Sequence, residues 1–389
     1  MARQLAVVGA GIAGLAAAVA LQRRGFGVTV LEERTDASSG AGISIWPNAL
    51  AALDEIGLGD AVRGAGGRVT AGAMRWRSGT WLRRPHPDRI VRALGEPLVV
   101  LRRAALTGIL RDALTPGTLR LGVGVIDIAD ADEGVRLRLS DGSTVEADAA
   151  VGADGTRSLF ARQLNGPLPD TYVGYTAWRG VADCSIDSEL AGETMGPGVE
   201  FGHVPMGPSH TYWFVTERAA EGTAAPDGEL SYLRRRYSSW AQPIPDILEC
   251  TDQAVVLRHD LYDRTPARVW ARGRIVLVGD AAHAMRPHLG QGGCQALEDA
   301  AILASFADGT TDLPGAFARF ADFRRPRVTP LIRESAMLGR IVNLRPAVLS
   351  AAASWASMLS PEPVLTRHLA SIASRRAFAM PTDRDVASA

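Results

Sequence analysis

The sequence predicts an α/β protein with a Rossmann-like nucleotide-binding domain, an interleaved antiparallel-sheet domain and helices at the C-terminus. Residues 5–32 read as strand, glycine-rich turn, helix and strand, and residues 275–306 as strand, glycine-rich loop and helix. Residues 166–271 shift toward Gly, Pro, Trp and Tyr with short alternating runs, which is typical of antiparallel strands. A chain of 389 residues is long enough for two domains with separate cores.

The N-terminal element carries a dinucleotide fingerprint. An apolar run over residues 5–8 precedes a G-x-G-x-x-G pattern, and an alanine-rich helix follows. The fingerprint positions are Gly9, Gly11, Ala13 and Gly14. Such glycines permit a tight turn, a close approach of the backbone to a pyrophosphate, and close packing of helix on strand. The next strand ends at Glu32, where a carboxylate can bind a ribose diol.

The second nucleotide-type element lies over residues 272–306. Residues 275–278 are apolar and mostly β-branched, which predicts a strand buried on both faces. Asp280 follows Gly279, where a carboxylate can turn toward a polyol. After Pro287 the glycine-rich loop lets backbone amides approach a ligand, and a helix is expected to begin near Cys294. A helix start favours an anionic ligand group. The loop consists of Gly290, Gln291, Gly292 and Gly293.

Three further segments connect these elements. Residues 66–98 predict a strand excursion into the second domain, and residues 99–101 return to a helix that opens at 102–103. Residues 119–128 and 135–139 predict hairpin strands with a turn at 141–142. A buried strand over residues 147–151 leads to Asp154, and residues 157–162 are placed on a helix. A purely local reading of Asp154 is that it caps this helix.

The antiparallel strands are predicted at residues 172–181, 199–204 and 210–216, and the chain is predicted to be helical beyond Arg324. Residues 347–359 are apolar but short, so they predict a packed helix rather than a membrane anchor.

Composition excludes several classes of protein. Lys plus Arg and Asp plus Glu number 42 each, which gives no electrostatic case for nucleic acid or an anionic membrane as partner. Hydrophobic residues make up 47%, so the chain is not disordered. Three scattered cysteines predict free thiols in a reducing compartment. With no run of transmembrane length, we expect a cytoplasmic protein with no membrane span. His283 and His288 lack partners at metal-ligand spacing, so no metal site is expected.

Three motifs in this order resemble those of the single-component, group A FAD-dependent aromatic hydroxylases, which include para-hydroxybenzoate, salicylate and urate hydroxylases. The motifs are GAGIAG from Gly9, GADGTRSLFAR from Gly152 and GDAAHAMRPHLGQG from Gly279. The resemblance implies a glutathione-reductase-type FAD-binding domain over residues 1–70, 99–165 and 272–330. It also implies a substrate-binding sheet domain over residues 71–98 and 166–271, and a C-terminal helical segment over 331–389.

The resemblance also implies roles for individual residues. Gly42 and Ile43 would lie near the flavin ring, and the Asp154 segment would serve both FAD and a visiting nicotinamide cofactor. Arg103 would reach the flavin side chain, although it equally fits a solvated arginine at a helix start. Residues expected near the adenosine are Glu33, Arg34 and Val125. Candidate wall residues of the substrate pocket are Arg179, Glu200, His203 and Tyr212, each with a solvent-facing orientation as the alternative.

The implied activity is hydroxylation or epoxidation of an aromatic or other electron-rich small molecule by NADPH or NADH and O2, through a flavin C4a-hydroperoxide. The single complete G-x-G-x-x-G suggests that the nicotinamide cofactor is a visitor. Amides of the glycine-rich loop would stabilise charge on reduced flavin, and Pro287 would shape the cavity where O2 reacts. His288 would take or relay a substrate proton, or simply face solvent.

The alternatives are an FAD-dependent reductase or dehydrogenase and a flavin-binding module without turnover. The sequence is compatible with a monomer or a homodimer.

Overall fold

The computed structural model describes residues 2–36, 41–70, 72–131 and 134–387. Its nucleotide-binding elements form a six-stranded sheet in the order β18-β19-β12-β1-β2-β8. The four strands from β19 to β2 run parallel to one another. The strands are β1 (Gln4–Val8), β2 (Gly27–Glu32), β8 (Leu119–Leu121), β12 (Ala149–Gly152), β18 (Ala271–Arg272) and β19 (Ile275–Leu277).

Helices α1 (Ile12–Arg23) and α10 (Gly292–Ala307) pack against each other beside this sheet. Their many alanines permit a close approach, and the central strands β1, β12 and β19 are almost entirely apolar because protein covers both faces. The expected helix start near Cys294 is two residues late, since α10 begins at Gly292. Glycine has a low helix propensity, which is why the sequence placed the boundary beyond it.

The second domain contains a seven-stranded sheet in the order β17-β13-β16-β15-β14-β5-β6. All neighbours are antiparallel except β14 and β5. Residues before 98 reach this sheet, because β5 and β6 form one of its edges. Its strands are β5 (Ala73–Trp76), β6 (Trp81–Arg83), β13 (Asp170–Ala182), β14 (Gly192–Gly196), β15 (Val199–Met206), β16 (His210–Glu217) and β17 (Leu257–Arg264).

Two small sheets and several helices complete the layers. The sheet β3-β7-β4 packs close to the seven-stranded sheet. The sheet β11-β10-β9 contains most of the predicted hairpin region, but residues 119–121 form β8 of the six-stranded sheet instead. Arg157 and Ser158 precede α6 rather than lie on it, with Ser158 as its N-cap. The small-sheet strands are β3 (Gly42–Ile45), β4 (Gly67–Val69), β7 (Leu98–Arg102), β9 (Val125–Ala131), β10 (Gly134–Leu139) and β11 (Thr144–Ala147). The helices include α2 (Pro47–Glu55), α3 (Gly59–Ala65), α4 (Pro87–Leu94), α5 (Arg103–Asp112), α6 (Leu159–Asn165), α7 (Glu229–Tyr237), α8 (Ile244–Glu249) and α9 (Asp280–His283).

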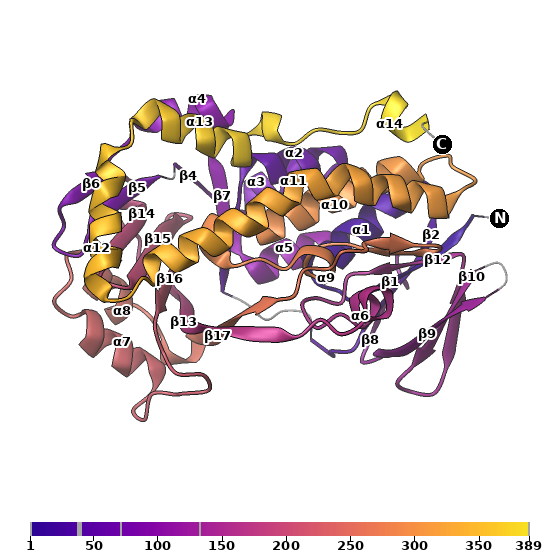
Figure 1. The fold of residues 1–389 in the computed structure, drawn as a ribbon, viewed down its shortest axis with the longest axis horizontal. Coiled ribbons are helices and arrows are strands. Elements are labelled where there is room, and N and C mark those ends of the chain that lie inside the picture. The colour runs from indigo at the N-terminus through magenta and orange to yellow at the C-terminus, as the bar shows by residue number, and fades with distance from the viewer. Residues whose placement is uncertain (1, 37–40, 71, 132–133, 388–389) are drawn as a thin grey trace.

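A 30-residue helix, α11 (Leu313–Val342), runs along the molecule from the nucleotide-binding end toward the seven-stranded sheet (Figure 1). The sequence predicted helix only beyond Arg324. Helix α11 begins eleven residues earlier and continues through Pro326 and Pro330, two residues that ordinarily interrupt a helix. The C-terminal helices are α12 (Ala347–Ala356), α13 (Glu362–Ala373) and α14 (Asp383–Ala387).

Candidate active site

The starts of α1 and α10 converge beside the end of β19. A Cβ added to Gly279 would collide with the side chain of Ala13, and one added to Gly293 would lie 3.0 Å from Cδ1 of Ile43. These contacts leave room only for hydrogen, which explains the small residues at Gly279 and Gly293. The N-terminal fingerprint and the glycine-rich loop, nearly 300 residues apart in the chain, therefore build one site.

The three fingerprint glycines have different surroundings. A Cβ on Gly9 would strike the carbonyl of Ala153, and φ at Gly9 is +104°. A Cβ on Gly14 would strike the carbonyl of Gly9, whereas a Cβ on Gly11 would meet no atom within 4 Å. Gly9 and Gly14 thus serve the turn and the packing. Gly11 leaves open space at the helix start, where a pyrophosphate can approach.

Both helix starts favour an anion. Neither α1 nor α10 has a side-chain cap or an acidic residue in its first turn among the described residues. Their first amide groups therefore keep hydrogen-bonding capacity and a partial positive charge. The Cys294 thiol is buried and donates to the carbonyl of Gly290 at 3.6 Å, and burial raises its pKa to about 12. Asp280, the first residue of α9, is exposed next to these amides.

The acid at the end of β2 is already engaged by backbone. Oε2 of Glu32 accepts from the Ala10 amide at 2.7 Å and Oε1 accepts from the Arg34 amide at 2.9 Å. Each oxygen retains a second lone pair for a ribose hydroxyl. Glu33 and Arg34 are exposed, and residues 122–125 lie beside them through the amides of Gly122 and Val123. The structure thus brings Val125 toward the two expected adenosine neighbours.

Asp154 caps α6, as the local reading anticipated. Its Oδ2 accepts from the Leu159 amide at 2.7 Å. Its Oδ1 is buried without a hydrogen-bond partner among the described residues, and burial raises the pKa of this carboxyl group. One oxygen is therefore structural, and the other remains available to a ligand.

Two buried N–H donors without hydrogen-bond partners also fit a flavin nucleotide. Nε1 of Trp46 and Nε2 of Gln291 are buried without a partner in the described part of the chain. Trp46 lies next to Gly290, where a Cβ would come 3.0 Å from the indole nitrogen. Buried donors of this kind need an acceptor. With the open space at Gly11 and the two uncapped helix starts, the residues present fit FAD.

A buried polar cluster, which we name the Arg324 network, supports the glycine-rich loop from the protein interior. Arg324 donates to Oδ1 of Asp299 and Oε2 of Glu298, both at 2.7 Å. Oδ2 of Asp299 accepts from the Gly279 amide at 2.8 Å and lies 2.6 Å from Nε2 of His283. Burial alone would raise the pKa of Asp299, but the charges of His283 and Arg324 outweigh it and lower the pKa. The network also contains Asn48, Gln291 and Gln295.

One face of the seven-stranded sheet lies toward the loops of the cofactor site, and we name it the front face. Residues paired across adjacent strands share a face, and one row holds Arg179, Phe214, Gly202 and Glu193. Tyr212 lies on the same face, and a Cβ on Gly42 would strike its ring. Burial raises the pKa of the Tyr212 hydroxyl, and the nearby guanidinium groups of Arg179 and Arg103 partly oppose the shift. Arg103, although exposed, is therefore close to this face.

His288 joins the loop before α10 to this front face. Its Nδ1 lies 2.7 Å from Oε2 of Glu200 and its Nε2 lies 2.8 Å from the hydroxyl of Tyr175. The His288 side chain is only 2% exposed, so the expectation that it might face solvent is wrong. Pro287, which opens this turn, is half-buried.

The chain of contacts continues in both directions. Beyond Tyr175, Arg286 donates to both oxygens of Asp263, at 2.8 and 2.6 Å, and the Asp263 side chain is 40% exposed. At the other end Glu193 is close enough to hydrogen bond to Glu200. Burial, with the charge of Glu200, raises the pKa of Glu193 to about 8. We name this chain the His288 network: Glu193, Glu200, His288, Tyr175, Arg286 and Asp263.

The four wall candidates do not all lie together. Glu200, His203 and Tyr212 are buried rather than solvated, and Arg179 is half-buried. His203 pairs with Trp213 and points to the opposite face, where Nε2 lies 3.1 Å from Oγ1 of Thr194. Burial and the charge of Arg75 lower the pKa of His203 to about 3. The structure separates His203 from the other three because strand side chains alternate between faces.

Sequence reasoning missed Glu193, Tyr175, Arg286 and Asp263. Tyr175 had a usable signal, since it lies four residues before Arg179 on one strand and therefore shares its face. Glu193 lies in a short strand bounded by glycines, which has no periodicity to place it.

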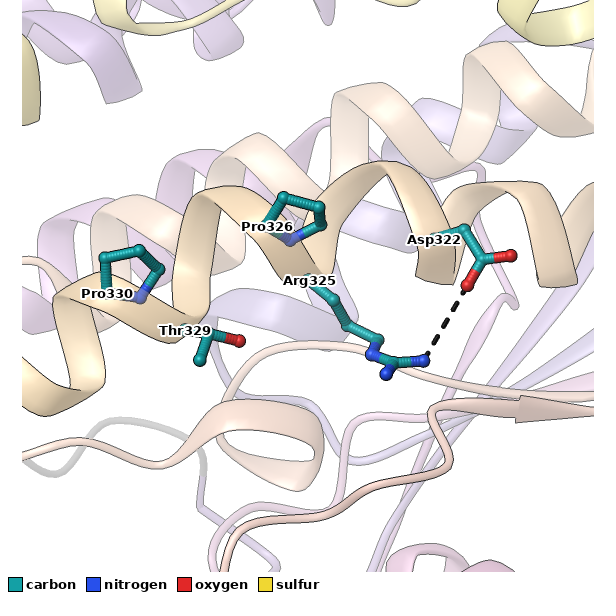
Figure 2. Close-up of a pocket in the computed structure, with 5 residues that line it drawn as sticks. All are labelled: Asp322, Arg325, Pro326, Thr329 and Pro330. Atoms are coloured by element: carbon teal, nitrogen blue, oxygen red, sulfur yellow. Dashed lines mark ion pairs between the residues drawn. The ribbon is translucent and has the colours of Figure 1, made fainter.

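A cavity on α11 lies elsewhere and has different chemistry. It measures about 440 Å³ and is lined by Asp322, Arg325, Pro326, Thr329 and Pro330 (Figure 2). Its single ion pair joins Arg325 to Asp322 at 3.7 Å with both side chains largely exposed. All of its lining residues are exposed or half-buried, so they do not resemble a preorganised site.

Comparison with known proteins agrees with this geometry. A model of the FAD binding domain family matches residues 3–307. Aurachin C monooxygenase/isomerase of Stigmatella aurantiaca is 38% identical, over 86% of this chain and 88% of that protein. Zeaxanthin epoxidase of Solanum lycopersicum is 37% identical over 82% of this chain, which spans only 49% of that longer protein.

Among solved structures, Klebsiella pneumoniae HpxO complexed with FAD and uric acid matches with a TM-score of 0.87 and 26% identity, covering 95% of this chain and 96% of that one. The matched family covers both glycine-rich elements of the site, and HpxO shares the fold over nearly its whole length. The chain therefore belongs to the FAD binding domain family and is an FAD-dependent monooxygenase of the aromatic hydroxylase type.

Proposed function

We propose that this enzyme uses NAD(P)H and O2 to hydroxylate a small, uncharged aromatic or heteroaromatic compound that carries a ring N–H or O–H. The overall reaction balances as substrate–H + O2 + NAD(P)H + H⁺ giving substrate–OH + H2O + NAD(P)⁺. The observation that carries this proposal is the His288 network. It sets two carboxyl groups and an imidazole between the front face and the glycine-rich loop.

The charges on the front face favour this substrate class. Glu193 keeps some accessible surface although it lies deep in the protein, and its neighbour Glu200 is fully enclosed. A carboxyl group whose pKa is raised to about 8 can donate or accept a hydrogen bond near neutral pH. A substrate N–H or O–H would stabilise the ionised form of Glu193, whereas a substrate carboxylate beside it would disfavour that form.

FAD, held by the two helix starts and reduced by NAD(P)H, supplies the chemistry that activates O2. This chain's residues would bind, orient and deprotonate. The amides of Gly292 and Gly293 would bind negative charge on the cofactor, and Pro287 would exclude water. Arg179 and Tyr212 would orient the ring against the front face.

The His288 network would move the substrate proton. Both ring nitrogens of His288 are engaged, so His288 would act as a link rather than touch the substrate itself. Glu193 would meet the substrate, Glu200 and His288 would share the proton, and Tyr175 would connect them to Arg286. Activation of an N–H or O–H raises electron density at the ring carbon that accepts oxygen.

A substrate panel tests this function. Phenols, indoles and purines are compared with aromatic carboxylic acids for stimulated NAD(P)H oxidation, and products formed under ¹⁸O2 are analysed by mass spectrometry. We expect one ¹⁸O atom in the product of an uncharged substrate, and little stimulation by the acids. NAD(P)H oxidation by the whole panel without any labelled product would overturn the proposal in favour of a reductase.

A further inference from the structure

Exposed apolar side chains gather at one end of the molecule. Twelve large hydrophobic side chains are exposed among the described residues, and eight of them lie between positions 337 and 364. Helix α12, at the centre of this segment, lies at the end of the molecule opposite the N-terminus (Figure 1). We name these eight the C-terminal patch: Met337, Leu344, Val348, Leu349, Trp355, Met358, Leu359 and Val364.

Helix α12 buries polar residues and exposes apolar ones, the reverse of a helix that packs on the core of a soluble protein. Its buried residues are Ser350 and Ser354, whereas Val348 is 65% exposed and Trp355 is 40% exposed. Leu359, just after the helix, is 85% exposed. A surface helix in water shows the opposite arrangement, with apolar residues inward. The outward side of α12 is therefore built for a medium less polar than water.

The inward serines hold the patch rigidly. Oγ of Ser350 donates to the carbonyl of Val342 at 2.6 Å and accepts from the amide of Gly198 at 3.1 Å. Arg83 donates to the carbonyls of Ser357 and Ser360 at 3.0 and 3.1 Å. The outward orientation is thus fixed by hydrogen bonds to β6 and to the β14–β15 turn.

The local charge is positive, although the whole chain is neutral. Residues 337–364, which span the patch, contain Arg340, Arg345 and one carboxylate, Glu362, which pairs with Arg89 at 3.5 Å. Arg340 and Arg345 are exposed, and neither forms an ion pair with any residue in the described ranges. The positive charge of Arg345 also adds to burial in lowering the pKa of the nearby Arg218.

We propose that the C-terminal patch docks on the surface of an anionic lipid bilayer. Apolar side chains flanked by unpaired arginines match the acyl boundary and the phosphate layer of such a surface, and tryptophan favours that interface. Docking is shallow, because α12 has ten residues, and no described helix is long and apolar enough to cross a membrane. A second copy of the chain fits less well, since a symmetric contact would bring the arginines of both copies together.

The balanced total of charges gave no case for an anionic membrane as partner. That expectation rested on the charge of the whole chain, whereas docking depends on the charge of one surface. Docking would hold the β14 side of the seven-stranded sheet near the lipid, because α12 packs on β14, the strand that carries Glu193.

Vesicle co-sedimentation of the FAD-loaded full chain tests the proposal. Phosphatidylcholine vesicles with and without phosphatidylglycerol are compared at low and high salt. We expect the protein to pellet with the anionic vesicles and to be released by salt. A Val348→Glu/Leu359→Glu variant should lose at least about tenfold in vesicle partitioning, and an Arg340→Gln/Arg345→Gln variant a similar factor.

Ile126→Glu is the matched control, because Ile126 is 49% exposed on β9, away from the patch, and should partition as wild type does. Flavin absorbance and circular dichroism confirm that each variant is folded. Three outcomes would overturn the proposal: wild type that stays in the supernatant at every composition, a Val348→Glu/Leu359→Glu variant that pellets as wild type does, or sedimentation velocity showing a dimer that this variant abolishes.

Discussion

Two buried polar networks flank the loop that begins α10, and they differ in charge balance. In the Arg324 network, two carboxylates face a guanidinium and an imidazole, and the lowered pKa of Asp299 keeps it ionised. In the His288 network, Glu193 and Glu200 lie together with a single imidazole beside Glu200, and the pKa of Glu193 is raised. Compensated charge holds a backbone in place, whereas uncompensated carboxyl groups exchange protons near neutral pH.

The difference assigns separate roles to the two networks. We expect breaks in the Arg324 network to reduce stability and cofactor retention. We expect breaks in the His288 network to change the rate and its pH dependence more than the stability.

The largest effect is expected from Arg324→Met, which leaves two buried carboxylates without their cation. The free energy of unfolding should fall by about 3–5 kcal/mol. Urea unfolding followed by circular dichroism measures this, and flavin absorbance after gel filtration measures cofactor retention. Arg325→Met is the control, because the neighbouring Arg325 side chain is 49% exposed and its removal should cost under about 0.5 kcal/mol. Equal effects of the two changes would contradict a structural role for the network.

His288→Asn should give the largest loss of rate. It removes the link between Glu200 and Tyr175, and we expect kcat to fall by about 100-fold while the FAD content is unchanged. Steady-state kinetics and the ratio of product to NAD(P)H oxidised measure the effect. Unchanged coupling across the pH range would remove His288 from the mechanism.

Glu193→Gln separates the two networks by pH. A folded pKa of about 8, above the unfolded value near 4.5, means that the folded state binds a proton that the unfolded state has released. Wild type should therefore lose stability, about 3 kcal/mol, as pH rises from about 5 to 8. The Gln variant should lack this loss. Urea unfolding at several pH values measures it, and parallel curves for the two proteins would argue against a raised pKa.

Tyr175→Phe should have the smallest effect. It removes one hydroxyl that lies 2.8 Å from Nε2 of His288, with little change in volume. We expect about 1 kcal/mol of destabilisation and a decrease in kcat of severalfold, with KM nearly constant. A larger change in KM than in kcat would instead indicate that Tyr175 contacts the substrate.

Sequence alone located the cofactor side of the site better than the substrate side. Gly9, Gly279 and Gly290 lie in local sequence patterns whose spacing reflects backbone geometry, so these glycines can be predicted from the sequence. The Arg324–Asp299 pair and the His288–Glu200 pair join residues 25 and 88 positions apart. A local sequence pattern cannot reveal pairs that lie so far apart in the chain.

The alternation of side chains between the two faces of a strand explains the error at His203. Glu200 and His203 differ by three positions and must face opposite sides of the sheet, although both were taken as wall residues. The early start of α11 is a separate miss, since residues 313–323 are helical although the sequence predicted helix only beyond Arg324.

The pH dependence of kcat/KM for an uncharged substrate, measured for wild type and Glu193→Gln, tests the central claim most directly. If Glu193 and Glu200 accept the substrate proton, wild-type kcat/KM should rise with an apparent pKa near 8, and the variant should be slower and lack that rise. Superimposable profiles for the two proteins would contradict the claim and leave the His288 network a structural element.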